Sequence, residues 1–290
     1  MKIWKKVVAA MTAGMLCLGS VGLSGVENVL KSVGTVLSAS AEETAETERV
    51  PVGTGTTTVR VGTGTTQLEY QAFDDDTVEI TDCDNEAAGE LEIPAEIDGK
   101  PVTSIGDSAF SVCSGLTKIT IPNGVTSIGD YAFSDCSGLT KITIPNGVTS
   151  IRDGAFSNCS GLTEITIPDS VTSIGDNAFS DCSGLTEITI PDSVTSIRAG
   201  TFSNCSGLTE ITIPDSVTSI GGSTFLKTPW LTAKQAENPL VIVNHILIDG
   251  KTCTGAVSIP NGVTSIGDDA FYNCSGLTEI TIPDSVTSIG

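Results

Sequence analysis

The chain has 290 residues, with 14 Lys or Arg against 35 Asp or Glu, and its formal net charge is -21. This balance argues against nucleic acid as a partner, because phosphate binding depends on clustered basic side chains. The single histidine, His245, excludes most catalytic triads and histidine-rich metal centres.

An export signal is predicted at the N-terminus, over residues 1–41. Lys2, Lys5 and Lys6 precede an apolar run over residues 7–23, and Ala39-Ser40-Ala41 has the small-x-small form that signal peptidases cleave. A membrane anchor is the alternative, but the run is interrupted by polar residues and glycines and is marginal for a span of about 20 residues. We expect a secreted or cell-surface product with no transmembrane segment in the mature chain.

Two short segments follow the signal. Residues 42–66 contain VGTGTTTVR and VGTGTTQLE, a duplication that predicts an extended Thr/Gly-rich linker or an edge hairpin. Residues 67–90 include an alternating run from Thr77 to Ile80 and are predicted to form a small β-rich N-terminal cap.

A 23-residue repeat dominates residues 91–290. The units 162–184 and 185–207 are identical at 18 of 23 positions. Seven of the eight phenylalanines are separated by 23 residues or, for the last two, by twice that number, and Ile248 occupies the position halfway between these two. The seven are Phe110, Phe133, Phe156, Phe179, Phe202, Phe225 and Phe271. A fixed period of this length is the signature of a repeat solenoid.

Each unit contains the pattern of a short strand followed by a turn. Ile188 and Ile190 flank an outward Thr189, and Pro191 then ends strand pairing because it has no amide to donate. Asp176 is expected to cap a short helical turn before the next phenylalanine. One unit buries too little apolar surface to fold alone, so the units must stack as a parallel-β solenoid.

The frame is embellished at residues 228–253. Pro229 and Trp230 predict the start of a short helix, and residues 240–249 predict two strands around Asn244-His245. Trp230 is expected to pack against the array, and His245 to be solvated in the turn. The sequence stops at Gly290 within a repeat, which indicates a truncated last unit and a fragment of a longer chain.

The pattern L-x-x-I-x-I-P-x-x-V-x-x-I-x-x-x-A-F-x-x-C resembles the BspA-like leucine-rich repeats of bacteria. The LTEITIP, VTSIG and AFSDC blocks of residues 91–290 carry the resemblance. It implies an exported or cell-surface protein that acts in adhesion or ligand recognition rather than catalysis.

Two kinds of side chain recur that could carry chemistry. The cysteines Cys113, Cys136, Cys159, Cys182, Cys205 and Cys274 keep the repeat frame. A ladder of buried thiols is favoured over disulfides, because residues in register point the same way. The Asp column at Asp107, Asp130, Asp153 and Asp176 is interpreted as capping or solvated rather than as a calcium site, since calcium needs converging oxygens. No metal site and no cofactor are predicted.

The outward strand positions are the candidate binding residues: Lys118, Thr120, Lys141, Thr143, Glu164, Thr166, Glu187, Thr189, Glu210 and Thr212. The sequence thus predicts a non-enzymatic recognition protein that binds a protein or glycan. The alternative is a structural or targeting array for a catalytic or anchoring module beyond residue 290. A hydrolase built from Asp and Glu pairs is disfavoured, because nothing breaks the repeat to form a pocket.

Overall fold

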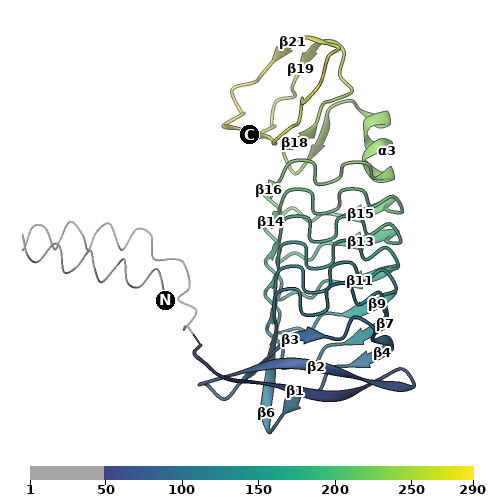
Figure 1. The fold of residues 1–290 in the computed structure, drawn as a ribbon. Coiled ribbons are helices and arrows are strands. Elements are labelled where there is room, and N and C mark those ends of the chain that lie inside the picture. The colour runs from purple at the N-terminus through teal and green to yellow at the C-terminus, as the bar shows by residue number, and fades with distance from the viewer. Residues whose placement is uncertain (1–48) are drawn as a thin grey trace, which may run out of the picture. The chain divides into compact units, whose positions relative to one another are not determined.

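The computed structural model describes residues 49–290, which contain a solenoid of short parallel strands (Figure 1). Strand pairs recur with a spacing of 23 residues, as in Ser150 with Ser173 and Ser173 with Ser196. This confirms the parallel-β solenoid that the repeat predicts.

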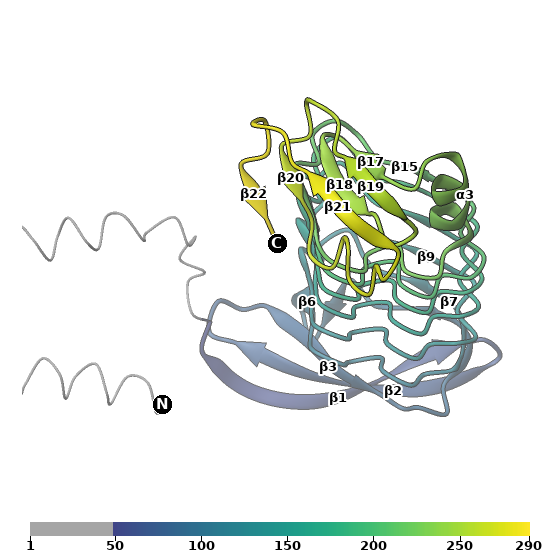
Figure 2. The same cartoon turned by 90° about the horizontal axis from the view of Figure 1, so that it is seen from above.

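Six strands form the N-terminal end: β1 (Pro51–Val61), β2 (Gly64–Phe73), β3 (Val78–Cys83), β4 (Ala88–Glu92), β5 (Glu96–Ile97) and β6 (Lys100–Ile105). β1 and β2 pair as one long antiparallel hairpin that lies across the base of the array (Figure 2). Because β2 runs through residue 66, the linker and the cap expected as separate segments share a strand. β3 pairs with β6 and β4 pairs with the next strand of the array, both in parallel, so the cap continues the solenoid.

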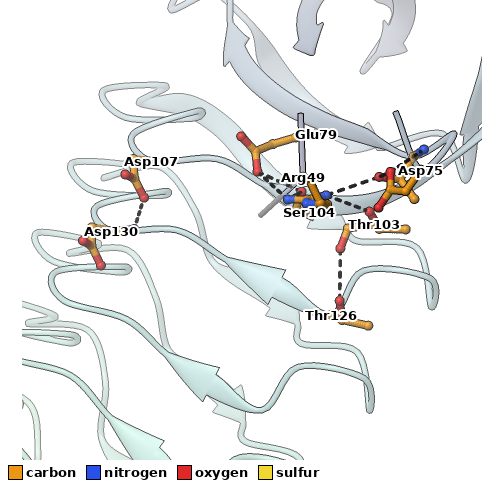
Figure 3. A network of polar contacts seen from close by, with 9 residues as sticks. Arg49, Asp75, Glu79, Thr103, Ser104, Asp107, Thr126 and Asp130 are labelled. Atoms are coloured by element: carbon orange, nitrogen blue, oxygen red, sulfur yellow. Dashed lines mark hydrogen bonds and ion pairs between the residues drawn. The ribbon is translucent and has the colours of Figure 1, made fainter. Parts of the chain in front are cut away.

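Arg49, the first described residue, ties the chain to the first turn (Figure 3). Its guanidinium donates to Glu79 at 3.3 Å and to Ser104 at 3.2 Å, and it lies 4.2 Å from the centre of the Phe73 ring. Ser104 in turn donates to Glu79 at 2.9 Å. The network therefore joins the hairpin, β3 and β6.

Two columns of strands run along the array. The first contains β7 (Gly115–Thr120), β9 (Lys141–Thr143), β11 (Glu164–Thr166), β13 (Glu187–Thr189) and β15 (Glu210–Thr212). The second contains β8 (Ser127–Ile128), β10 (Ser150–Ile151), β12 (Ser173–Ile174), β14 (Ser196–Ile197) and β16 (Ser219–Ile220). Each strand is short because a proline or a turn follows it in every unit.

Stacked phenylalanines fill the core between these columns. Ring centres from Phe110 through Phe225 are 5.2 to 6.0 Å apart, and neighbouring rings are within 11° of parallel. Trp230 packs against Phe225 at 4.7 Å and ends the stack, which confirms that this tryptophan is buried against the array. Each ring thus covers the ring of the preceding turn, as stacking of identical units requires.

One residue of each turn holds a left-handed backbone conformation just before the cysteine. The φ angles are 60° at Asp135, 59° at Asn158, 61° at Asp181 and 60° at Asn204, residue types that tolerate this region. In the first turn the position is occupied by Val112, with φ of 66°. A β-branched side chain is strained there, since its branched carbon crowds the backbone.

Replacing this residue is expected to relieve the strain. We expect Val112→Asn to raise the free energy of unfolding by about 1 kcal/mol, since Val112 is 52% exposed and gives up little buried surface. Urea unfolding of the two proteins measures the difference. Val112→Ile, which keeps the branched carbon, should not stabilise; equal stability of the Asn variant and the parent would contradict the prediction.

The embellished repeat contains α3 (Pro229–Glu237), β17 (Val241–Val243) and β18 (Ile246–Asp249). Thr228 accepts the amide of Leu231 at 3.1 Å and caps the helix. β17 and β18 form an antiparallel hairpin around Asn244 and His245. The helix and the hairpin that the sequence predicts here are both confirmed.

The frame through this repeat differs from the expected one. The amides of the phenylalanines from Phe110 to Phe202 each donate to the carbonyl just before the phenylalanine position of the next turn. The amide of Gly250 makes the same contact with Ala270, so Gly250 and not Ile248 holds that backbone position. A side chain at Gly250 would begin 2.3 Å from the Phe271 ring. Leu247 pairs with Ile266, only 19 residues later and not the usual 23. The turn before Leu247 is correspondingly longer, because it contains the helix.

The last strands are β19 (Gly255–Ser258), β20 (Ser265–Ile266), β21 (Leu277–Thr281) and β22 (Ser288–Ile289). They again pair in parallel, β19 with β21 and β20 with β22. Apolar side chains of this end of the array form a second core cluster, which includes Leu247, Ile259 and Val263.

Candidate functional site

The ten predicted residues form one exposed face of the first strand column, here called the repeat face. Every one of them is exposed, and the isoleucines between them point into the core. The alternation follows from strand geometry, which turns successive side chains to opposite sides. Lys118 lies beside Lys141, and Glu187 lies beside Glu210, in register.

Ion pairs divide the repeat face into two halves. Lys118 pairs with Glu90 of β4 at 3.3 Å, and Lys141 pairs with Glu164. Glu187 and Glu210 have no ion-pair partner among residues 49–290. The later turns therefore carry uncompensated negative charge, whereas the earlier turns are close to neutral.

A shallow groove of about 630 Å³ lies over the later turns. Seven of the ten predicted residues line it: Lys141, Glu164, Thr166, Glu187, Thr189, Glu210 and Thr212. Lys118, Thr120 and Thr143 belong to the same face but lie outside the groove. The structure thus brings most of the predicted residues to one concave surface.

The groove also contains residues that the sequence analysis missed. Its lining also includes Ile165 and Ile188 of the strands and Asp169 and Pro191 of the turns. Asp169 belongs to the Pro-Asp-Ser turn directly after β11, and the recurrence of this turn in successive units was the available signal. It adds another carboxylate to an already acidic edge.

The Asp column is structural, but its contacts differ from those predicted. Asp176 was expected to cap its own turn, yet its Oδ1 accepts the amide of Ala199 in the following turn at 2.9 Å. Asp107 likewise accepts the amide of Asp130 at 2.8 Å (Figure 3). The segment before each phenylalanine is a series of hydrogen-bonded turns rather than a helix, so the exposed amides that the carboxylates reach belong to the next unit.

The cysteine ladder consists of free thiols, which are buried from Cys113 to Cys205 and partly buried at Cys274. Cys136, Cys159, Cys182 and Cys205 each donate to a phenylalanine carbonyl of the preceding turn, at 3.0 to 3.1 Å. Burial raises the pKa of Cys136 and Cys205 to about 12 and raises the pKa of Cys159 and Cys182 as well. These thiols are fixed structural groups, as the sequence analysis favoured.

His245 is exposed in the hairpin turn, as predicted, and its Nδ1 lies 3.0 Å from the carbonyl of Gly262. Within residues 49–290, no three His, Cys, Asp or Glu side chains are placed to hold a metal ion. The same residues include no helix that is long and apolar enough to span a membrane. The predicted signal peptide, residues 1–41, lies outside the described residues.

A family model described as the BspA type leucine rich repeat region matches residues 101–232 and 250–290, in six copies. No curated protein matches the chain.

Several solved structures are similar. A leucine-rich cell surface protein from Faecalibacterium prausnitzii A2-165 is 30% identical with a TM-score of 0.52, over 81% of this chain and 72% of that chain. The pneumococcal vaccine antigen PcpA is 20% identical with a TM-score of 0.52, over 80% of this chain and 66% of that one, which shows the fold alone. A leucine-rich repeat protein of T. pallidum is 30% identical, over 56% of this chain and 87% of that one, with a TM-score of 0.49.

Proposed function

The chain belongs to the BspA-type leucine-rich repeat family, and from this premise we propose that it is an exported, non-enzymatic recognition protein that binds a protein or a glycan through its repeat face. The observation that carries the proposal is the groove over β9 to β15, which seven outward residues of the repeat face line. A concave surface of this kind is how solenoid proteins engage extended partners.

The regular spacing of the repeat face supports binding to an extended partner. Each turn presents one charged residue and one threonine at the same place, with a buried or partly buried isoleucine between them. Weak contacts at fixed spacing on a rigid array add together, because the array is already ordered before the partner binds.

The charge of the groove favours a basic protein segment as the partner. Glu187 and Glu210 are exposed and lack ion-pair partners within the described chain, and Asp169 lies on the same groove. An extended segment with lysines or arginines about one strand spacing apart would place its charges over Glu187 and Glu210, which lie on adjacent strands. A glycan, bound through the threonines of the groove, is the other outcome to be tested.

Export is supported by two separate observations. The sequence before residue 42 has the charged start, apolar run and small-x-small ending of a signal peptide. The similar protein from F. prausnitzii is described as a cell surface protein. Adhesion to another cell or to a host surface is the role that we propose for the binding face.

Reversing the two unpaired charges tests the proposal. We expect Glu187→Lys combined with Glu210→Lys to weaken binding of a basic peptide roughly tenfold or more, because two attractive contacts become repulsive, each worth about 1 kcal/mol. The measurement is binding to an array of extended Lys- and Arg-containing peptides, with a glycan array in parallel. The wild-type affinity should also fall as salt rises.

The matched control is Glu69→Lys combined with Glu96→Lys, which makes the same charge change at exposed positions outside the groove. This control should bind like the wild type. If a peptide or glycan that binds the wild type bound the groove variant equally well, the repeat face would not be the binding site. Circular dichroism of each variant checks that the fold is retained.

A further inference from the structure

Cys83 and Cys113 meet at the junction of the N-terminal end and the first turn. Cys83 ends β3, whereas Cys113 is the first member of the cysteine ladder. Both are buried, and their sulfurs approach the same carbonyl oxygen, that of Asp84, at 3.7 and 3.9 Å. Cys113 also lies 3.8 Å from the carbonyl of Cys83 itself.

This arrangement differs from the rest of the ladder. Cys136 and the three following cysteines point the same way and are held by phenylalanine carbonyls at 3.0 to 3.1 Å. No phenylalanine turn precedes Cys113, and its nearest acceptors in residues 49–290 are 3.8 Å away. Cys83 comes from a strand outside the repeat frame, and its side chain is close enough to that of Cys113 to share a hydrogen bond with it.

The surroundings also favour reaction at Cys83. The hydrogen bond from Cys113, with a smaller contribution from Thr66, lowers the pKa of Cys83, while the same contact raises the pKa of Cys113. Thr66 Oγ1 is the buried side-chain oxygen of the described residues that has no conventional hydrogen-bond partner. Cys83 is thus the thiol of this pair that ionises first, and the thiolate is the reactive form.

We propose that Cys83 and Cys113 form a redox-active pair that closes a disulfide between β3 and the first turn, while the ladder from Cys136 to Cys205 stays reduced. The oxidant is a small-molecule or protein disulfide. The Cys83 thiolate attacks it, forming a mixed disulfide and releasing one thiol. The Cys113 thiol then loses its proton and attacks the Cys83 sulfur, releasing the second thiol. Two cysteine thiols are oxidised, and one external disulfide is reduced.

The bridge would hold the N-terminal end onto the array. It links residues 83 and 113, which lie on separate strands and turns, and so restricts the unfolded chain. An exported protein meets the oxidising conditions in which such bonds persist. The bridge forms whichever partner the repeat face binds.

Disulfide mapping of the full chain tests the proposal. The reduced protein is incubated with oxidised glutathione, blocked with N-ethylmaleimide in denaturant and digested without reductant. We expect one cross-linked peptide pair, Cys83 with Cys113, and alkylated peptides for Cys136, Cys159, Cys182 and Cys205. The melting temperature should rise by roughly 5 to 10 °C and return after dithiothreitol.

Alkylated Cys83 and Cys113 after oxidation, or cross-links within the ladder, would overturn the proposal. Cys83→Ser should lose both the cross-link and the oxidant-dependent rise in melting temperature. The control Cys182→Ala should keep both. Because the mapping of the wild-type protein decides the question alone, the result stands even if a variant folds poorly.

Discussion

Raising the pH from 8.5 to 9.5 is expected to lower the free energy of unfolding by about 4 kcal/mol, through the four buried thiols of the ladder. Cys136, Cys159, Cys182 and Cys205 all have pKa values raised by burial. In the unfolded chain a thiol ionises near pH 8.5. Across this interval the unfolded state therefore loses protons that the folded state retains.

The sign of the effect follows from the raised pKa values. Below about pH 8.5 the thiols are protonated in both states, and the full stability is present. Above that pH the unfolded state is increasingly favoured, until the folded thiols themselves ionise near pH 12 at Cys136 and Cys205. Alkali should thus unfold the array although the thiols lie far from solvent.

Urea unfolding with a reductant present, at pH 7.5, 8.5 and 9.5, measures this dependence. Cys182→Ala removes one of the four groups and should reduce the slope against pH by about a quarter. Thr189→Ala, on the exposed repeat face, should leave the slope unchanged. A Cys182→Ala slope equal to that of the wild type would show that the thiols do not cause the loss.

Removing one ring from the phenylalanine stack is expected to have a similarly large effect. Phe179 is fully buried, with its ring centre 5.4 Å from that of Phe156 and 5.6 Å from that of Phe202. We expect Phe179→Ala to cost about 3 to 5 kcal/mol, because the cavity cannot collapse between two turns held by strand pairing. Denaturant unfolding measures the loss.

Two further variants separate the cavity from other effects of substitution. Phe179→Leu fills most of the space and should cost less than Phe179→Ala. Thr166→Ala, at an exposed strand position, should change stability by less than about 0.5 kcal/mol. A loss below about 1 kcal/mol for Phe179→Ala would mean that the stack contributes little to holding the turns together.

Much of the fold could be predicted from the sequence because each turn repeats the contacts of the last. The spacing of the phenylalanines reports the stacking period, and the alternation around Ile188 reports which side chains face outward. The repeat face was predictable for the same reason. Its grouping into a groove was not, because the hollow is lined by residues of several units, including Asp169 and Pro191 of the turns, which come together only once the units stack.

Other features depend on contacts that no local pattern reveals. Asp176 reaches an amide 23 residues later, a relation that exists only once the turns are stacked. Cys83 lies outside the repeat frame, so nothing in its spacing indicates that it faces Cys113. Phe225 and Phe271 are 46 residues apart, but the two turns that share this interval have unequal lengths. A constant period of 23 residues therefore predicts Ile248 at the backbone position that Gly250 occupies in the structure.

The sameness of the turns has a consequence for how such a chain can evolve. The surface of unit 162–184 that packs against the next unit is nearly the same as the surface of the preceding unit against which it packs. Loss or duplication of one whole unit would therefore rejoin matching surfaces, changing the array by about 4.8 Å in length without creating a new core. Recombination between near-identical coding segments could thus adjust how far the groove extends, while selection on individual residues adjusts what it binds.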